Sequence, residues 1–214
     1  MSLEFRVFAF GKNSNSLLTY PLSPKNMSDT LQSLLELLGR EQASAALAHI
    51  DDNEHSYIKD LKINVSNALK FQHLTEKEIA LLVLATAINS KSELLINTFK
   101  EKAINLGSTS QEIAEIYAIV SLMNVNNVFY RFRHFTQKAY YEQTQAGIKM
   151  NIMVKPVLGK EFFELVSLAI SAINGCELCV KSHEESVLKH GCTEARVYDA
   201  VRLVSIIKGL EVLL

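Results

Sequence analysis

The chain has 214 residues, 48% of them hydrophobic and 21% charged, which is the composition of a folded globular protein and excludes a disordered one. With only 8 glycines and 3 prolines, it is also unlike collagen and unlike a turn-dense β-sandwich. Its 22 basic and 23 acidic residues give a formal net charge of -1, so no basic field is available for phosphate backbones and nucleic acid is not expected as a partner.

No part of the sequence predicts a membrane span or a secretory signal. The longest apolar run, residues 79–88, falls well short of the roughly 20 residues that cross a bilayer. The apolar patch at residues 5–10 is short and interrupted by charge, unlike a signal peptide. We therefore expect a cytoplasmic protein without a membrane partner. There, three cysteines do not predict a disulfide framework, and a C-x-x-C pair indicates catalysis or metal binding.

Residues 1–26 differ from the rest of the chain, because they hold two of the three prolines and a Gly-Lys-Asn-Ser-Asn-Ser run. We interpret them as an irregular N-terminal extension with at most one short strand. From residue 27 onward the apolar residues recur at helical spacing. Residues 27–214 are therefore expected to form a single all-α domain.

Capping patterns divide this domain into predicted helices. Thr75 with Glu78, and Thr109 with Glu112, have the spacing of capping boxes, in which the two side chains satisfy free backbone N–H groups at a helix start. Residues 124–159 look less regular. One predicted helix follows Ser28, and the others cover residues 57–69, 76–89, 92–106, 110–123, 160–173, 176–190 and 194–214.

A weak internal repeat runs through the domain. Residues 86–89 (Thr-Ala-Ile-Asn) match residues 171–174 (Ser-Ala-Ile-Asn), and each match follows an apolar helix and precedes a helix that ends near a glycine. The pattern predicts a duplicated helical unit, with repeats at about residues 74–124 and 159–212. A four-residue match is also compatible with coincidence.

The residues that carry chemistry are Cys176, Cys179 and His183. On one helix their spacing places them on one face. Because Asn174 and Gly175 break the chain just before, both cysteines should lie in the first helical turn, where free N–H groups and the helix dipole favour a thiolate. The histidine could support that thiolate or remove its proton.

Other interpretations remain open at this point. Structural zinc requires four ligands, and this segment supplies three without a second C-x-x-C. The cysteines could instead fill the core as small apolar residues, and the histidine could pack without chemistry. In the register of the four-residue match, the two cysteines and the histidine correspond to residues of the first repeat that are neither thiols nor imidazoles: Lys91, Leu94 and Thr98. The scaffold therefore does not require thiols.

At these residues the chain resembles the alkyl hydroperoxidase D (AhpD) family of the carboxymuconolactone decarboxylase-like superfamily. The likeness covers roughly residue 27 to the end. It includes four separated motifs in order: residues 58–64, residues 126–131, residues 150–152 with Pro156, and residues 171–183.

The resemblance implies an all-α fold of duplicated helical units, assembled as a homotrimer. It implies a thiol-dependent antioxidant protein that reduces alkyl hydroperoxides. Such proteins also pass electrons from a dihydrolipoamide-bearing protein to the peroxiredoxin AhpC. No bound cofactor and no metal are implied, only an external dithiol donor such as dihydrolipoamide.

The resemblance also places a catalytic glutamate at Glu164, twelve residues before the first cysteine. In the register of the repeat its counterpart is Ile79. We expect burial on this apolar helix to raise the pKa of the Glu164 carboxyl and to make it a proton relay with His183. The alternative is a half-exposed helix residue, as expected for Glu161. The chain departs from many family members at Leu178, where they carry a histidine.

The expected mechanism starts with Cys179, whose thiolate attacks the peroxide, and Cys176 then resolves the sulfenic acid to a disulfide. Spacing alone leaves the roles of the two cysteines interchangeable. The alternatives are a disulfide-exchange adaptor with little peroxidase activity and a non-redox carboxymuconolactone decarboxylase-like enzyme, which would not need a dithiol. No catalytic role is expected for four further residues: Cys192, His73, His134 and His190. Residues 126–133 are expected to fix the link between the repeats by packing and backbone hydrogen bonds. The alternative is a role at the mouth of the site.

Overall fold

The computed structural model describes residues 27–214, so the interpretation of residues 1–26 lies outside the described part. Within that part every regular element is helical, which confirms the all-α prediction. The elements are α1 (Asp29–Leu37), α2 (Ala45–Asp52), α3 (Tyr57–Ala68), α4 (Glu76–Ser90), α5 (Glu93–Asn105), α6 (Ser110–Thr136), α7 (Ala139–Gln143), the 3₁₀ turn η1 (Asn151–Met153), α8 (Lys160–Ile173), α9 (Glu177–Lys189) and α10 (Glu194–Glu211). No helix of residues 27–214 combines the length and the apolar character needed to cross a membrane.

The predicted helix starts agree with the structure. The Ser28 side chain accepts a hydrogen bond at the start of α1. Both capping boxes form at α4 and α6, with the threonine accepting from the third helical residue and the glutamate accepting from the cap backbone.

The end predicted for α6 is wrong, because this helix continues past Met123 to Thr136. Asparagines are poor helix formers, which made residues 124–127 look like a helix end. In the structure Asn126 and Asn127 are buried and their side chains contact neighbouring elements, so tertiary contacts stabilise helix where propensity does not. The short helices α2 and α7 were also not predicted.

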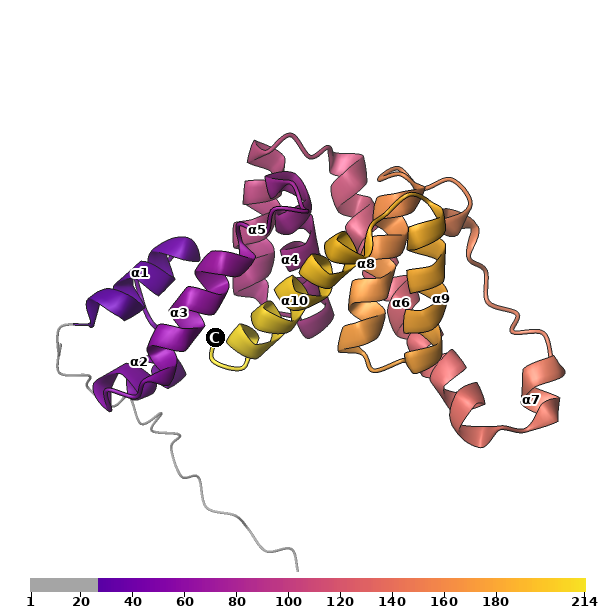
Figure 1. The fold of residues 1–214 in the computed structure, drawn as a ribbon, viewed down its shortest axis with the longest axis horizontal. Coiled ribbons are helices and arrows are strands. Elements are labelled where there is room, and N and C mark those ends of the chain that lie inside the picture. The colour runs from indigo at the N-terminus through magenta and orange to yellow at the C-terminus, as the bar shows by residue number, and fades with distance from the viewer. Residues whose placement is uncertain (1–26) are drawn as a thin grey trace, which may run out of the picture.

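Two helices form the centre of the core. Residues 79–87 of α4 and residues 162–171 of α8 are buried without interruption, as expected for helices that are covered on all sides. Helix α10 packs against both of them, and α1–α3 lie beside α10 at one end of the molecule (Figure 1). Helices α6, α8 and α9 lie side by side, and their contacts create the site described below.

Half-buried ion pairs and hydrogen bonds to a buried carboxylate join these helices at their starts. Arg196 of α10 pairs with Glu78 of α4 at 2.5 Å and with Glu161 of α8 at 2.9 Å. Glu115, buried in α6, accepts hydrogen bonds from the backbone N–H groups of Val157 and Leu158, just before α8. The start of α8 is therefore held from two sides.

The helix order α4–α5–α6 is followed by a similar order, α8–α9–α10, and the two turns inside them correspond in geometry. Ser92 is the N-cap of α5 and its N–H donates to the Ala87 carbonyl, whereas Cys176 is the N-cap of α9 and its N–H donates to the Ser171 carbonyl. Each cap follows a residue with positive φ, Lys91 at 59° and Gly175 at 68°.

This geometry shifts the register taken from the sequence match by one residue. It pairs Cys176 with Ser92 rather than with Lys91. In this register the two cysteines, Cys176 and Cys179, correspond to Ser92 and Leu95. His183 corresponds to Phe99, and Glu164 corresponds to Ala80. None of these is a thiol, an imidazole or a carboxylate, so the conclusion that the first unit lacks the reactive groups is unchanged.

Candidate active site

The two cysteines lie at the N-terminal end of α9, as predicted. Cys176 is the N-cap and Cys179 lies in the first turn, and the two are joined by a disulfide with a Cα–Cα distance of 5.3 Å. Gly175 provides the positive φ that the preceding turn requires, which side chains with a Cβ rarely adopt. In the reduced state the free N–H groups of this helix start favour thiolate at both sulfurs.

His183 and Glu164 form a buried pair beside the cysteines. His183 Nδ1 lies 2.7 Å from Glu164 Oε2, across the packed helices α9 and α8. The two side chains are 9% and 3% exposed, so the contact is shielded from water. The structure therefore brings together Glu164, Cys176, Cys179 and His183, as the sequence led us to expect.

Lys160 completes this arrangement and was not identified from the sequence. Its Nζ lies 2.9 Å from Glu164 Oε1 and donates to the backbone carbonyl of Met153 at 2.8 Å. The sequence feature that could have identified Lys160 is its i, i+4 spacing from Glu164, which brings a lysine and a glutamate together on one helix. A lysine at a helix start usually lies in solvent, so the spacing alone did not single it out.

The expected direction of the Glu164 pKa shift is wrong. Burial does raise the pKa of this carboxyl, but hydrogen bonds and charge from His183 and Lys160 outweigh burial and lower the pKa from its ordinary 4.5 to about 2. Glu164 is therefore a carboxylate at neutral pH and can only accept hydrogen bonds. Since Nδ1 of His183 must then carry the proton, Nε2 of a neutral imidazole is left as the acceptor.

A cavity of about 440 Å³ opens beside Cys179 and His183. Cys176 is 1% exposed and is not part of the lining, which distinguishes the two sulfurs. Leu178 lines the cavity and is 46% exposed. Many members of the family that the chain resembles carry a histidine at this position. The lining residues come from α6, the segment around η1, and α9: Asn126, Tyr130, Met150, Met153, Leu178, Cys179, Ser182 and His183.

Side chains from α6 hold the turn before Cys176. Arg131 donates to the Asn174 carbonyl at 2.6 Å, and Asn127 accepts from the Asn174 side chain at 2.9 Å and donates to Ser171 at 2.9 Å. Asn89, near the end of α4, donates to Asn174 at 3.0 Å. The segment of residues 126–133 thus joins α6 to the turn between α8 and α9 through side-chain hydrogen bonds rather than the expected backbone ones, because it is itself helical.

The remaining cysteine lies apart from this site. Cys192 is 8% exposed and does not line the cavity. Burial, together with the neighbouring Glu161 carboxylate, raises the pKa of its thiol to about 12.

Three histidines also have partners elsewhere. His73 lies 2.7 Å from Asp199, His134 lies 3.7 Å from Glu177, and His190 contacts the Ser186 carbonyl at 2.7 Å. None of the three lines the cavity beside Cys179.

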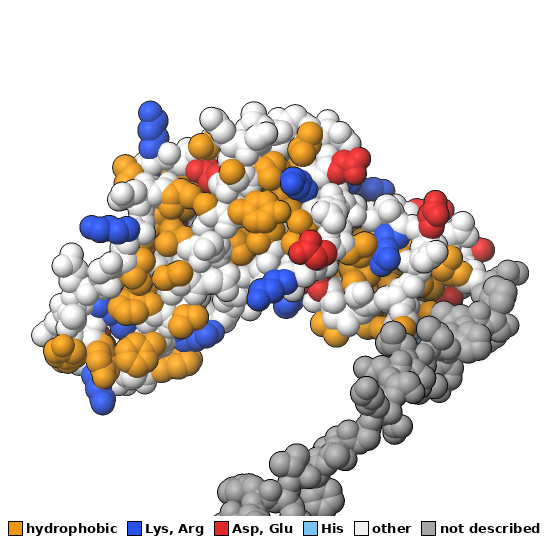
Figure 2. Space-filling view, turned by 180° about the vertical axis from the view of Figure 1, so that it is seen from behind, with side chains coloured by type: hydrophobic (Ala, Val, Ile, Leu, Met, Phe, Trp, Pro, Cys, Tyr) orange, Lys and Arg blue, Asp and Glu red, His pale blue; other side chains and the backbone are white. Residues whose placement is uncertain are grey.

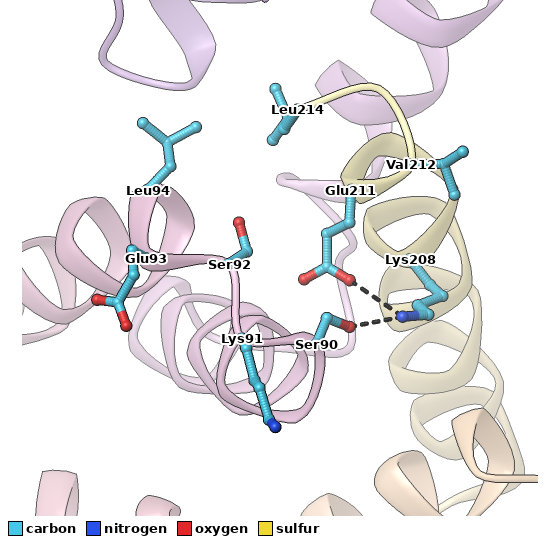
Figure 3. Close-up of a pocket in the computed structure, with 9 residues that line it drawn as sticks. All are labelled: Ser90, Lys91, Ser92, Glu93, Leu94, Lys208, Glu211, Val212 and Leu214. Atoms are coloured by element: carbon cyan, nitrogen blue, oxygen red, sulfur yellow. Dashed lines mark hydrogen bonds and ion pairs between the residues drawn. The ribbon is translucent and has the colours of Figure 1, made fainter. Parts of the chain in front are cut away.

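A second cavity, of about 490 Å³, lies between the α4–α5 turn and the end of α10 (Figure 3). The cavity is lined by the carboxylate of Glu211, whose side chain is 5% exposed. This carboxylate lies 3.6 Å from Nζ of Lys208. The Lys208 ammonium also donates a hydrogen bond to the Ser90 hydroxyl at 2.6 Å. Burial raises the pKa of Glu211. The lining of this cavity contains no cysteine and no histidine.

Among residues 27–214, no three histidine, cysteine, aspartate or glutamate side chains gather in a group that could hold a metal ion. Cys176 and Cys179 use their sulfurs in the disulfide, and His183 uses Nδ1 on Glu164. The donor set that zinc would need is therefore engaged in other bonds.

Comparison with known proteins identifies the family and the fold. A family model described as the carboxymuconolactone decarboxylase family matches residues 139–214, which include the reactive unit. A solved structure described as a gamma-carboxymuconolactone decarboxylase subunit of Burkholderia xenovorans LB400 aligns with a TM-score of 0.62 over 87% of this chain and 94% of that one. At 16% identity it shows a shared fold.

Several curated relatives carry the name alkyl hydroperoxide reductase AhpD. The protein from Anaeromyxobacter dehalogenans strain 2CP-1 is 37% identical over 173 residues, covering 78% of this chain and 90% of the relative. The protein from Coxiella burnetii strain RSA 493 is 33% identical over 162 residues, covering 74% of this chain and 91% of the relative. This identity extends over most of both chains, and the chain therefore belongs to the AhpD family of carboxymuconolactone decarboxylase-like proteins.

Proposed function

We propose that this protein is a thiol-dependent alkyl hydroperoxide reductase that cycles Cys176 and Cys179 between dithiol and disulfide. The observation that carries the proposal is the convergence of Cys179 and a carboxylate-bound His183 on one cavity. The relatives named alkyl hydroperoxide reductase AhpD support the same activity.

In the first step the Cys179 thiol gives its proton to Nε2 of His183 and attacks the terminal oxygen of the hydroperoxide. The S–O bond forms as the O–O bond breaks, and the departing alkoxide takes the proton from the imidazolium, which leaves an alcohol and a sulfenic acid. Glu164 stabilises the imidazolium through Nδ1 and stays ionised throughout.

In the second step Cys176 attacks the sulfur of the sulfenic acid. The disulfide forms and water leaves. We assign the first attack to Cys179 because it lines the cavity, whereas Cys176 is more deeply buried. An external dithiol such as dihydrolipoamide then exchanges with the disulfide, restores both thiols and leaves as its own cyclic disulfide.

The redox partners follow from this cycle as further parts of the proposal. We propose a dihydrolipoamide-bearing protein as donor and the peroxiredoxin AhpC as an acceptor of electrons. A cycle that needs a steady dithiol supply suits the reducing cytoplasm. A disulfide-exchange adaptor would use the same two cysteines but would show peroxide turnover only with the peroxiredoxin. A non-redox decarboxylase would leave the disulfide without a role.

We also propose that copies of the chain associate as a homotrimer built from duplicated helical units. Helix α6 exposes apolar side chains along a groove, among them Tyr117, Val125, Val128 and Phe132. Hydrophobic side chains also gather at the end of the molecule formed by α6 and α7 (Figure 2), where Phe135 is 73% exposed. Apolar patches of this kind favour contact with another protein surface.

The test of the activity uses reduced protein, tert-butyl hydroperoxide and intact mass spectrometry, with Cys192→Ser as the matched control. We expect a loss of two hydrogens in the wild type and in the control, mapped to the Cys176–Cys179 disulfide and reversed by dihydrolipoamide. Thiols that stay unmodified in excess peroxide, both alone and with the peroxiredoxin, would contradict the proposal. Oxidation only in the presence of the peroxiredoxin would identify the adaptor instead.

A further inference from the structure

The cavity beside Cys179 contains a buried polar atom without a partner. Asn126 lies on α6, is 5% exposed and lines the cavity together with Cys179 and His183. Its side-chain N–H donates to the sulfur of Met150 at 3.3 Å. Its carbonyl oxygen, Oδ1, is buried and accepts no hydrogen bond from any described residue.

Such an atom calls for an explanation, because a buried acceptor without a donor destabilises the folded state. The next residue on the same helix shows the contrast. Asn127 uses both ends of its amide, donating to Ser171 and accepting from Asn174. The scaffold role thus falls on Asn127, whereas Asn126 lines the cavity and holds an acceptor that no described residue uses.

The rest of the cavity indicates what that ligand is. The wall is largely apolar, with Tyr130, Met150, Met153 and Leu178 around the reactive sulfur. A fitting ligand has an apolar body and one small donor group. An organic hydroperoxide has this form, and its single donor, the O–H, sits on the oxygen that a thiolate attacks.

We propose that Asn126 is a substrate-binding residue whose Oδ1 accepts the hydrogen bond from the O–H of an organic hydroperoxide and thereby orients the terminal oxygen toward Cys179. The inference rests on the proposed peroxidase function. The O–H bond does not break in this step. As the S–O bond forms and the O–O bond breaks, that oxygen keeps its hydrogen and becomes the sulfenic hydroxyl, and the alkoxide takes its proton from His183.

The inference predicts a selective defect, because the external dithiol does not need this acceptor. Asn126→Leu should lower the second-order rate constant for oxidation by cumene hydroperoxide by about ten- to a hundredfold, as expected when a site loses its hydrogen bond to a substrate hydroxyl. Reduction of the preformed disulfide by dihydrolipoamide should change less than about threefold, since exchange between a dithiol and a disulfide does not use the Asn126 acceptor. The pH profile of the oxidation should keep its shape, because Asn126 transfers no proton.

The experiment follows each half-reaction in a single turnover by rapid acid quench and intact mass, on full-length protein. Asn97→Leu, at an exposed position of α5, is the matched control and should match the wild type. Asn126→Ala provides the same comparison should the leucine variant not fold. Equal oxidation rates in wild type and variant would overturn the inference, as would an equal loss in both half-reactions. A wild type that does not react with peroxide would instead contradict the proposed function itself.

Discussion

The turn between α4 and α5 and the turn between α8 and α9 have the same backbone geometry but different chemistry. In the first unit, the positions that correspond to Cys179, His183 and Glu164 hold fully buried apolar residues: Leu95, Phe99 and Ala80. In the second unit the same scaffold holds a thiol, an imidazole and a carboxylate. The comparison shows that these buried positions hold apolar side chains in one turn and, in the other, polar groups that satisfy one another.

The largest expected effect comes from giving the second turn the residues of the first. The double substitution Cys176→Ser, Cys179→Leu copies Ser92 and Leu95, so the helices should still pack while peroxide turnover falls to the uncatalysed background. Peroxide consumption with dihydrolipoamide and thermal unfolding by circular dichroism measure the two properties. A variant that keeps its activity would show that the dithiol is not the reactive group.

The next effect concerns the carboxylate and its lysine. Glu164→Gln should lower kcat/KM by about 10²–10⁴-fold, because His183 loses the anion that stabilises its protonated form. Lys160→Met acts through Glu164 and should cost roughly tenfold, which corresponds to about 1.5 kcal/mol for a charge-assisted hydrogen bond. In Lys160→Met the loss of stability in acid should also begin at higher pH, because the pKa of Glu164 rises when the cation is removed.

The same pair predicts how stability depends on pH. Since the folded state lowers the pKa of Glu164 from 4.5 to about 2, its contribution is complete above about pH 5 and is lost as the pH falls toward 2. Urea unfolding at pH 3 and pH 7 should therefore show a smaller difference for Glu164→Gln than for the wild type. An equal difference in the two proteins would place the acid sensitivity in other carboxyls.

The smallest expected effect lies at Glu211, in the second cavity. Burial raises the pKa of this carboxyl, so its charged form costs free energy in the folded state and the cost appears as the pH rises through that pKa. Glu211→Gln should raise the free energy of unfolding by about 0.5–1 kcal/mol at pH 8, and the gain should vanish in acid. A loss of stability at pH 8 would mean that the pairing with Lys208 outweighs the burial of the charge.

The sequence was sufficient for features that depend on local patterns. Capping boxes at Thr75 and Thr109 marked two helix starts, and the spacing of Cys176, Cys179 and His183 placed them on one helix face. The resemblance to the AhpD family added Glu164. The helix starts and the place of the two cysteines agree with the structure because neighbours along a helix determine this geometry, and the catalytic roles stay predictions.

The features that the sequence did not reveal depend on contacts between helices. The end of α6 was misplaced because the partners of Asn126 and Asn127 lie on other elements. The pKa of Glu164 was expected to rise because burial was considered without Lys160 and His183. The one-residue error in the register of the repeat arose because a short sequence match carries no information on where the backbone turns.

Cys192 has a consequence for the redox cycle as a whole. Burial and the neighbouring Glu161 carboxylate raise the pKa of its thiol to about 12, so this thiol stays protonated near pH 7. Exchange between this thiol and the Cys176–Cys179 disulfide is correspondingly suppressed, so the chain can keep a third cysteine without scrambling its bond. In the proposed cycle each chain therefore holds one exchangeable pair of sulfurs, and titration of the native protein with a thiol reagent should count two fast sulfurs after reduction and none after oxidation.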